Sequence, residues 1–301
     1  MPSLPYKPLG TQIIGDKSIA AGGETVNADL PSDFTVTGLL ITEKLVQDTN
    51  EATLAEKLAS INQFELVTRS GGPWKISGTD LFYMNRDLLG KEPHISQNSV
   101  ATDNYIIYKS LLVLFNPLGV LDTRFGVSPR TRGAVRFTMG TDAATGCDDR
   151  TLTVEAVGYE GLNCAEYMGC FVDPFTSTAT DNFRDIQADR VAGMMGVYHF
   201  QTTGVEDLTT TDAPGLKEIG WAVAKSVRTK TKAHALQLLD SAWNTNARGE
   251  GVGLPNSDYT LMNTGLRTGH YIPYTNNLQV YLNCGVAEAA RTHPLLAVRN
   301  E

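Results

Sequence analysis

The feature that most constrains the fold of this 301-residue chain is an internal repeat. Three consecutive blocks recur at a nearly constant shift of 155 or 156 residues. The paired blocks are residues 36–42 with 191–197, residues 62–69 with 218–225, and residues 77–85 with 233–241. The repeat is one of apolar pattern more than of residue identity. Blocks that recur in order at one spacing predict two copies of the same domain.

Each copy is predicted to consist mainly of short strands separated by turn signals. Residues 151–159 alternate cleanly, with Leu152, Val154 and Ala156 on one face. We interpret residues 278–286 as their counterpart in the second copy, at a shift of 278 minus 152, or 126 residues. The earlier blocks have a shift of 156 residues, so the second copy is predicted to be 156 minus 126, or 30, residues shorter than the first. The missing material is assigned to loops. Further strands are predicted at residues 11–28, 34–44, 64–69, 74–76, 105–115 and 134–139.

One helix is predicted in each copy at the equivalent place. Ser77 and Asp80 have the spacing of a capping box, and the apolar residues that follow predict a helix that Gly90 ends. The partner helix is predicted from about residue 232, because Leu236, Leu239 and Trp243 would share one apolar face. A short helical excursion is also predicted within residues 51–61.

This pattern predicts an all-β fold of two tandem eight-stranded jelly-roll barrels, each with an inserted short helix. The predicted parts are an N-terminal arm (1–10), a first jelly roll (11–160), a linker that also starts the second barrel (161–189), a second jelly roll (190–286) and a C-terminal tail (287–301). The arm is predicted from its three prolines. The tail is predicted to be short, with helix as far as Ala290.

The composition favours a folded chain that does not hold nucleic acid through its charge. Apolar residues make up 42% of the chain and charged residues 19%, with a net charge of −8. A surface that binds phosphates non-specifically needs a dense basic face. Residues 225–232 carry four positive charges, which we interpret as a solvated hairpin edge protected against aggregation.

No signal peptide or membrane span is predicted, because the N-terminal residues lack an apolar core and no apolar run is long enough. The four cysteines, Cys147, Cys164, Cys170 and Cys284, lack the CxxC spacing of a metal or redox motif. We expect reduced thiols, although Cys164 and Cys170 are close enough in sequence to pair if oxidised.

No catalytic or cofactor-binding residue is predicted, and a metal site is left open. The five histidines, His94, His199, His234, His270 and His293, form no metal-binding motif. The glycine-rich residues 249–253 follow a helix instead of a strand, so we interpret them as a loop and not as a phosphate site. Asp142, Asp148 and Asp149 fall in one predicted loop and could bind calcium, but they lack EF-hand spacing.

The layout resembles the double jelly-roll major capsid proteins of tailless, icosahedral bacteriophages with an internal membrane, the corticovirus and tectivirus-like lineage. The resemblance rests on the repeated blocks at residues 34–42 and 190–198, and on the strand–turn–strand–helix of residues 64–85 with its copy at 221–243. It implies a homotrimer of pseudo-hexagonal outline within a shell over a membrane. The implied partners are neighbouring trimers, minor capsid or penton proteins, membrane-associated virion proteins and the membrane surface. It implies no cofactor, no catalytic residue, no direct nucleic-acid contact, and assembly in the virion after synthesis in the host cytoplasm.

Two other classes of protein share parts of this pattern. A secreted two-barrel protein that binds or hydrolyses glycans would use carboxylate pairs or stacking aromatics, for which Tyr259, Tyr271 and Tyr274 are the only cluster. Such a protein is expected to have a signal peptide and disulfides. A trimeric receptor-binding spike is expected to have a fibrous or coiled-coil stem. The sequence shows no signal peptide, no evident disulfide framework and no such stem, which favours the capsid interpretation.

Overall fold

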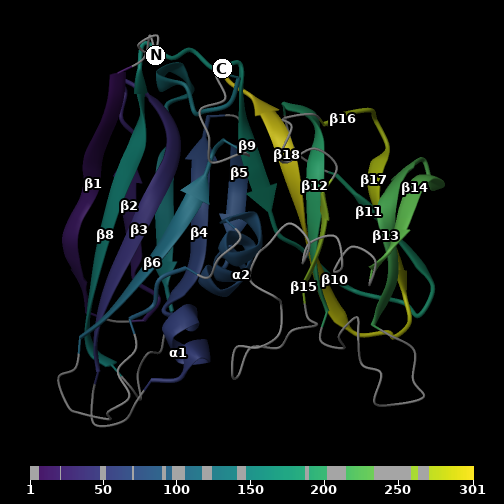
Figure 1. Cartoon of the computed structure of the whole chain (residues 1–301), viewed down its shortest axis with the longest axis horizontal. Helices are drawn as coiled ribbons and strands as arrows, with labels where there is room; N and C mark the ends of the chain where they lie inside the picture. The colour runs from purple at the N-terminus through teal and green to yellow at the C-terminus, as the bar shows by residue number, and fades with distance from the viewer. Residues whose placement is uncertain are drawn as a thin grey trace. The chain divides into compact units, whose positions relative to one another are not determined.

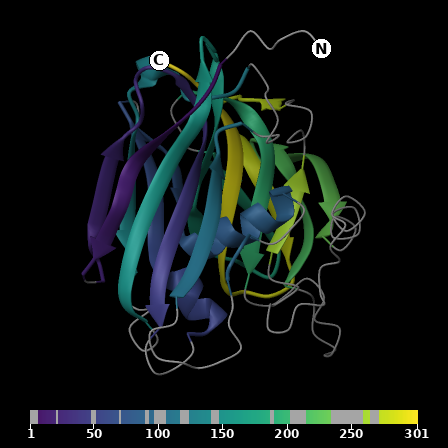
Figure 2. The same ribbon diagram turned by 60° about the vertical axis from the view of Figure 1, so that its left-hand side comes forward.

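The computed structural model shows two units built largely of β-strands (Figures 1 and 2). The first unit contains residues 1–169 and 298–301, and the second contains residues 170–297. The structure describes residues 7–20, 22–47, 52–69, 71–89, 93–96, 106–116, 124–140, 147–186, 190–201, 215–233, 259–263 and 271–301.

The first sheet of unit 1 has four antiparallel strands in the order β1-β8-β3-β6. Its strands are β1 (Lys7–Ile19), β3 (Thr35–Gln47), β6 (Ile106–Leu114) and β8 (Cys147–Glu160). The alternation predicted for residues 151–159 is present. Leu152, Val154 and Ala156 are fully buried, whereas Glu155 and Val157 between and beyond them are exposed. Period-two burial of this kind places one face of the sheet on the core.

The second sheet of unit 1 supplies the other half of that core. Its strands follow the order β2-β7-β4-β5, and β9 (Glu166–Phe171) lies beside β5. They are β2 (Thr25–Asp29), β4 (Ile61–Thr68), β5 (Gly71–Ile76) and β7 (Ala134–Met139). Buried Phe64 packs against Trp74 and Phe137 at centroid distances of 6.2 and 5.2 Å. The indole of Trp74 donates to the Met168 carbonyl at 2.5 Å, which satisfies its polar atom inside the core.

The two helices predicted in the first copy are confirmed. Helix α1 (Leu54–Ala59) starts with a capping box in which Thr53 and Glu56 exchange hydrogen bonds. Helix α2 (Gly78–Leu89) follows Ser77, whose hydroxyl accepts from the Asp80 amide at 3.0 Å. A short 3-10 turn, Pro129–Thr131, is the remaining helical segment in the described part of unit 1.

Unit 2 also contains two sheets. The first has the order β10-β18-β12-β15, with β16 also paired to β12, and the second has the order β11-β17-β13-β14. The strands are β10 (Asp173–Thr176), β11 (Asp181–Asp185), β12 (Val191–Gln201), β13 (Leu216–Val223), β14 (Ser226–Lys232), β15 (Tyr259–Asn263), β16 (Ile272–Pro273), β17 (Leu278–Cys284) and β18 (Ala289–Arg299).

The two units have the same topology. When the strands of each unit are numbered one to eight along the chain, with β9 and the two-residue β16 left out, both have sheets ordered one-eight-three-six and two-seven-four-five. This arrangement is a jelly roll, and its occurrence in both units makes the chain a double jelly roll. The repeated blocks at residues 36–42 and 191–197 fall on the third strands, β3 and β12. Those at residues 62–69 and 218–225 fall on the fourth strands, β4 and β13, so both predicted correspondences are confirmed.

The predicted counterpart of residues 151–159 is wrong. Those residues lie in β8, the eighth strand of unit 1, whereas residues 278–284 form β17, the seventh strand of unit 2. The true counterpart of β8 is β18, which occupies the residues predicted to be a tail with some helix. Both β17 and β18 bury apolar residues, and periodicity cannot distinguish one buried strand from its neighbour.

Two further boundaries differ from the sequence prediction. Residues 7–10, predicted to be part of an arm, begin strand β1, and the predicted linker contains β9, β10 and β11. Proline is tolerated in β1 because this strand lies at the edge of its sheet. The predicted arm residues 1–6, and the predicted partner helix beyond Ala233, lie outside the described residues.

Candidate functional site

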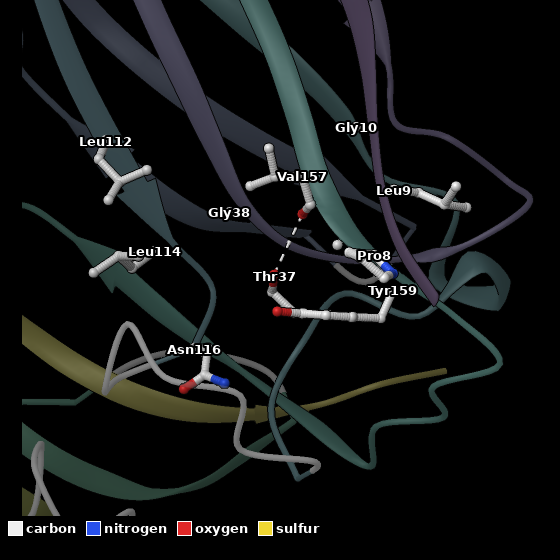
Figure 3. Close-up of a pocket in the computed structure, with 11 residues that line it drawn as sticks. Pro8, Leu9, Gly10, Thr37, Gly38, Leu112, Leu114, Asn116, Val157 and Tyr159 are labelled. Atoms are coloured by element: carbon white, nitrogen blue, oxygen red, sulfur yellow. Dashed lines mark hydrogen bonds between the residues drawn. The ribbon is translucent and has the colours of Figure 1, made fainter. Parts of the chain in front are cut away.

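A hollow of about 530 Å³ opens on the outer face of the first sheet of unit 1 (Figure 3). All four strands of that sheet contribute to it. Its lining residues are Pro8, Leu9, Gly10, Thr37, Gly38, Leu112, Leu114, Asn116, Val157, Gly158 and Tyr159. The volume falls in the range of sites that take a ligand or a side chain from a partner.

Strand register explains why the hollow exists. Gly10, Val157, Gly38 and Leu114 are directly paired across β1, β8, β3 and β6, so they form one row across the sheet. Paired residues of an antiparallel sheet point to the same face, and two of these four lack a side chain. The row therefore has two gaps flanked by apolar side chains.

The glycines differ in how much space a side chain would find. A Cβ atom at Gly38 would lie 3.0 Å from the Val113 carbonyl oxygen, which is a tight contact. At Gly10 the nearest atoms would be 3.8 and 3.9 Å away, which is ordinary packing distance. The hydroxyl of Thr37 donates to the Val157 carbonyl at 3.3 Å and ties β3 to β8 beside the hollow (Figure 3).

The outer face of this sheet carries exposed apolar side chains both at the hollow and along β6. Along each strand the exposed positions of an antiparallel sheet are normally polar. Here three of the five large hydrophobic side chains found exposed in the described part of the chain share this face: Ile106, Tyr108 and Val157, at 40%, 45% and 37%. We name the surface formed by these residues and the hollow the apolar face. Ile106 and Tyr108 pair with Val46 and Lys44, towards the other end of β3 from Gly38, so the exposed apolar side chains extend along the face from the hollow. Apolar exposure that continues along one sheet face marks an interaction surface.

The charged residues on and around the apolar face carry both signs: Glu155 lies nearest the hollow, and Lys44 lies further along β3, opposite Tyr108. Glu155 is exposed in the row next to the hollow, paired with Gln12 and Leu40. Glu160 lies at the end of β8 and forms an exposed ion pair of 3.6 Å with Lys7. An exposed pair of this length stabilises the fold little, so both carboxylates remain available to a partner.

A second surface lies on the β13–β14 hairpin of unit 2. Ala224 and Lys225 connect the strands with φ angles of 49° and 63°, the left-handed conformation that a two-residue hairpin turn requires. Strand β14 lies at the edge of its sheet, and six of its seven residues are exposed. The predicted basic hairpin edge at residues 225–232 is therefore confirmed. Its cations are Lys225, Arg228, Lys230 and Lys232.

A polar network fixes the hairpin to its sheet. Lys230 pairs with Glu218 at 2.8 Å, and the hydroxyl of Tyr281 donates to Asp181 at 2.9 Å. Desolvation by burial, followed by the hydrogen bond to Asp181, raises the pKa of Tyr281 to about 12, so the phenol remains protonated. The turn amide of Lys225 donates to the Gln279 side chain at 2.8 Å.

Two sets of buried titratable groups have their partners or charge state fixed by the core. Lys109 lies opposite Glu43 in register, with Nζ 2.5 Å from the carboxylate and both side chains fully buried. Nζ also donates to the Lys57 carbonyl and to Ser60. In unit 2, burial lowers the pKa of His199 to about 4, so the ring is neutral. No group of three potential metal ligands occurs in the part of the chain that the structure describes.

The described cysteines are thiols. Cys164, Cys170 and Cys284 are buried and form no disulfide, in agreement with the expectation of reduced cysteines. The pairing of Cys164 with Cys170 that oxidation would allow is absent. Burial raises the pKa of the Cys284 thiol to about 11, which makes it a poor nucleophile. The side chain of Cys147 is not among those that the structure describes.

The structure brings together two of the candidate residues from the sequence, His199 and His293, which are close enough for their charges to interact. His199 and His293 are buried, whereas His94 and Asp149 are exposed. Tyr271 and Tyr274 are half-buried. The other candidate positions lie outside the described residues or side chains, namely His234, His270, Asp142, Asp148, Tyr259 and residues 249–253. None of the described helices is long and apolar enough to cross a membrane. Sequence reasoning missed the hollow because strand register, not sequence spacing, assembles it.

The fold defines the class of protein to which this architecture belongs, the double jelly-roll proteins. Several solved structures with the same fold are viral capsid proteins. The chain matches the major capsid protein P2 of bacteriophage PM2 with a TM-score of 0.64 and 11% identity over 98% of both chains. It matches a chain in the atomic structure of Sulfolobus turreted icosahedral virus with a TM-score of 0.67 and 9% identity, over 97% of this chain and 91% of that one.

A third match is to the PBCV-1 virus capsid, with a TM-score of 0.59 and 10% identity, over 97% of this chain and 93% of that one. At these identities the similarity shows a shared fold. No protein-family model matches the sequence. No curated protein matches it either.

Proposed function

We propose that this chain is a viral major capsid protein that self-associates as a pseudo-hexagonal homotrimer and forms an icosahedral shell over an internal membrane. The observation that carries the proposal is the duplicated jelly roll, combined with near-complete coverage by capsid proteins of the same fold. This function places the chain in the virion, with copies of itself, minor capsid or penton proteins and membrane-associated virion proteins as its neighbours. The role is structural, with no catalytic step and no cofactor.

The duplication supports the trimer on geometric grounds. Three copies of a chain with two similar domains place six similar domains around one axis, and a six-fold outline tiles a closed shell. A net charge of −8 fits a coat that does not hold the genome directly. That the virus is a bacteriophage is also part of this proposal, and the major capsid protein P2 of bacteriophage PM2, which has the same fold, supports it.

Light scattering on purified protein tests the proposal. A homotrimer has a mass of three times 32.6 kDa, or about 98 kDa. A stable species of that mass that assembles into closed particles, visible by negative-stain microscopy, is the expected result. A monomer of 32.6 kDa at high concentration that binds to a glycan array would contradict it.

A further inference from the structure

We propose that the apolar face of unit 1 receives the β13–β14 hairpin of a second copy of this chain, in a head-to-tail contact. The inference rests on the proposed self-association and specifies which surfaces make it. It assigns Val157 and the hollow at Gly10 to the receiving side, and Val227 and Arg228 to the inserted side.

The receiving side offers an open apolar recess on a rigid sheet. The hollow is lined by Leu112, Leu114 and Val157, and its row lacks two side chains. Exposed apolar surface around a recess is the usual anchor point of a protein interface. A recess of about 530 Å³ is large enough for side chains from a partner strand.

The inserted side offers an exposed apolar side chain next to a cation, which matches an apolar recess beside a carboxylate. Val227 is 37% exposed and stands on an edge strand, between the turn and Arg228. It is the only large hydrophobic side chain that is exposed in the described part of unit 2. An apolar side chain next to an arginine is the composition found at interface centres, where arginine is enriched and lysine depleted.

Charge complementarity selects this hairpin as the partner. The hairpin carries Lys225, Arg228, Lys230 and Lys232, of which Lys230 is paired with Glu218. Next to the hollow the receiving face carries the exposed carboxylate of Glu155; Glu160, at the end of the same strand, is shared with Lys7, and Lys44 lies away from the hollow, opposite Tyr108. Opposite potentials steer association and fix its register. A contact between two apolar faces would instead place the Glu155 residues of two copies near each other.

The size of the face agrees with a contact between copies. Four strands about 4.8 Å apart, with a β6 length of nine residues at about 3.3 Å each, give a face of roughly 19 by 30 Å, or about 570 Å². A stable interface buries about 800 Å² per partner. The face therefore supplies most of one such contact before its loops are counted.

A head-to-tail contact uses two different surfaces, so each copy has one receiving and one inserting side. Such contacts form a ring when the rotation between copies closes. Three copies close the ring proposed above, and each copy then has both surfaces covered.

The test uses surface variants of the full chain and light scattering. Val157→Arg places a charge in the hollow, Gly10→Leu fills it without backbone strain, and Arg228→Glu reverses the charge of the hairpin. Each is expected to shift the mass from about 98 to about 33 kDa while circular dichroism and the melting temperature stay close to those of the wild type. The matched controls are Leu89→Arg, which is also 37% exposed, and Arg69→Glu on an exposed turn. Both controls are expected to remain trimeric.

Mixing the variants tests the head-to-tail direction. Val157→Arg retains a working hairpin and Arg228→Glu retains a working hollow, so an equimolar mixture is expected to form a dimer of about 65 kDa and no larger species. Glu155→Arg combined with Arg228→Glu in one chain is expected to associate at least tenfold more tightly than Arg228→Glu alone. A mixture that stays monomeric, or variants that remain trimeric, would overturn the inference.

The two proposals fail differently in these experiments. A wild-type monomer contradicts the capsid function itself. If the wild type is a trimer and Val157→Arg, Gly10→Leu and Arg228→Glu are trimers too, the capsid function is not contradicted. The proposed contact between the apolar face and the hairpin is then wrong.

Discussion

At the scale of single residues, the buried pair of Lys109 and Glu43 is the clearest departure from an apolar core. The two residues face each other across β3 and β6, where both side chains are fully buried. Lys109 completes its hydrogen bonds with the Lys57 carbonyl and Ser60. The pair is tolerated because each charge has a partner, and a buried charge without one is strongly destabilising.

We predict that Lys109→Met destabilises the protein by about 3–5 kcal/mol, because it leaves the Glu43 carboxylate buried without its cation. The double variant Lys109→Met, Glu43→Leu is expected to recover most of that loss. Urea unfolding of the wild type and both variants measures the difference. A double variant as unstable as the single one would show that packing, and not the uncompensated charge, is responsible.

His199 predicts a pH dependence for unit 2. Burial, in surroundings that include Gln201, His293 and Arg291, lowers its folded pKa to about 4 from an ordinary value of 6.5. The unfolded chain therefore binds more protons between these two values, so stability is fully present above pH 6.5 and falls as the pH drops towards 4. The loss is about 3 kcal/mol from this residue.

His199→Gln is expected to remove that part of the pH dependence, as measured by urea midpoints at intervals between pH 7 and pH 4. His94→Gln, at an exposed histidine, serves as the control and should leave the profile unchanged. An unchanged profile in His199→Gln would mean that other groups cause the acid sensitivity.

At the scale of secondary structure elements, the β13–β14 hairpin combines a demanding turn with an unusually exposed strand. Residues other than glycine and asparagine adopt the left-handed conformation at a cost of about 1–2 kcal/mol. Ala224 and Lys225 both adopt it, and the amide of Lys225 is held by Gln279. The turn is kept in place by the sheet, not by its own residues.

Ala224→Gly is accordingly expected to stabilise the protein by about 1 kcal/mol, since glycine reaches this conformation without a steric cost. Ala222→Gly, two residues earlier in a buried position of β13, is expected to destabilise it by about the same amount. Thermal unfolding of the two variants measures both effects. Equal destabilisation by the two substitutions would contradict the turn conformation.

At the scale of the whole molecule, each jelly roll has central strands and edges. In unit 1, β8 and β3 are paired on both sides, whereas β1 lies at an edge and is mostly exposed. In unit 2, β17 is paired on both sides and β14 lies at an edge. Exposed edge strands open more readily than strands paired on both sides.

Hydrogen exchange is therefore expected to be slow in β3, β8 and β17 and at least a hundredfold faster in β14 of the dissociated chain. Trimer formation is expected to slow exchange in β14 and at the β8 residues around Val157, because both surfaces become covered. Mass spectrometry of peptides from wild type and Arg228→Glu measures this. Fast exchange in β14 of the trimer would place the hairpin outside the interface.

Several features follow from local sequence alone. Ser77 and Asp80 predicted the start of α2, the alternation around Val154 predicted β8, and the four cations at residues 225–232 predicted a solvated hairpin edge. The correspondence between residues 36–42 and 191–197 predicted the duplication. Each of these signals is contained in a short segment or in a fixed sequence shift. It can therefore be read without knowing which strands pair.

Strand pairing and the hollow were decided by the tertiary structure. The buried strands β17 and β18 carry similar apolar patterns. Only their positions in the two sheets of unit 2 show that β18 is the counterpart of β8. Gly10, Gly38 and Val157 meet because register aligns three strands that are distant in the sequence. Hydrophobic periodicity fixes which side of a strand faces the core, but the neighbour of that strand depends on packing and hydrogen bonds across the whole chain.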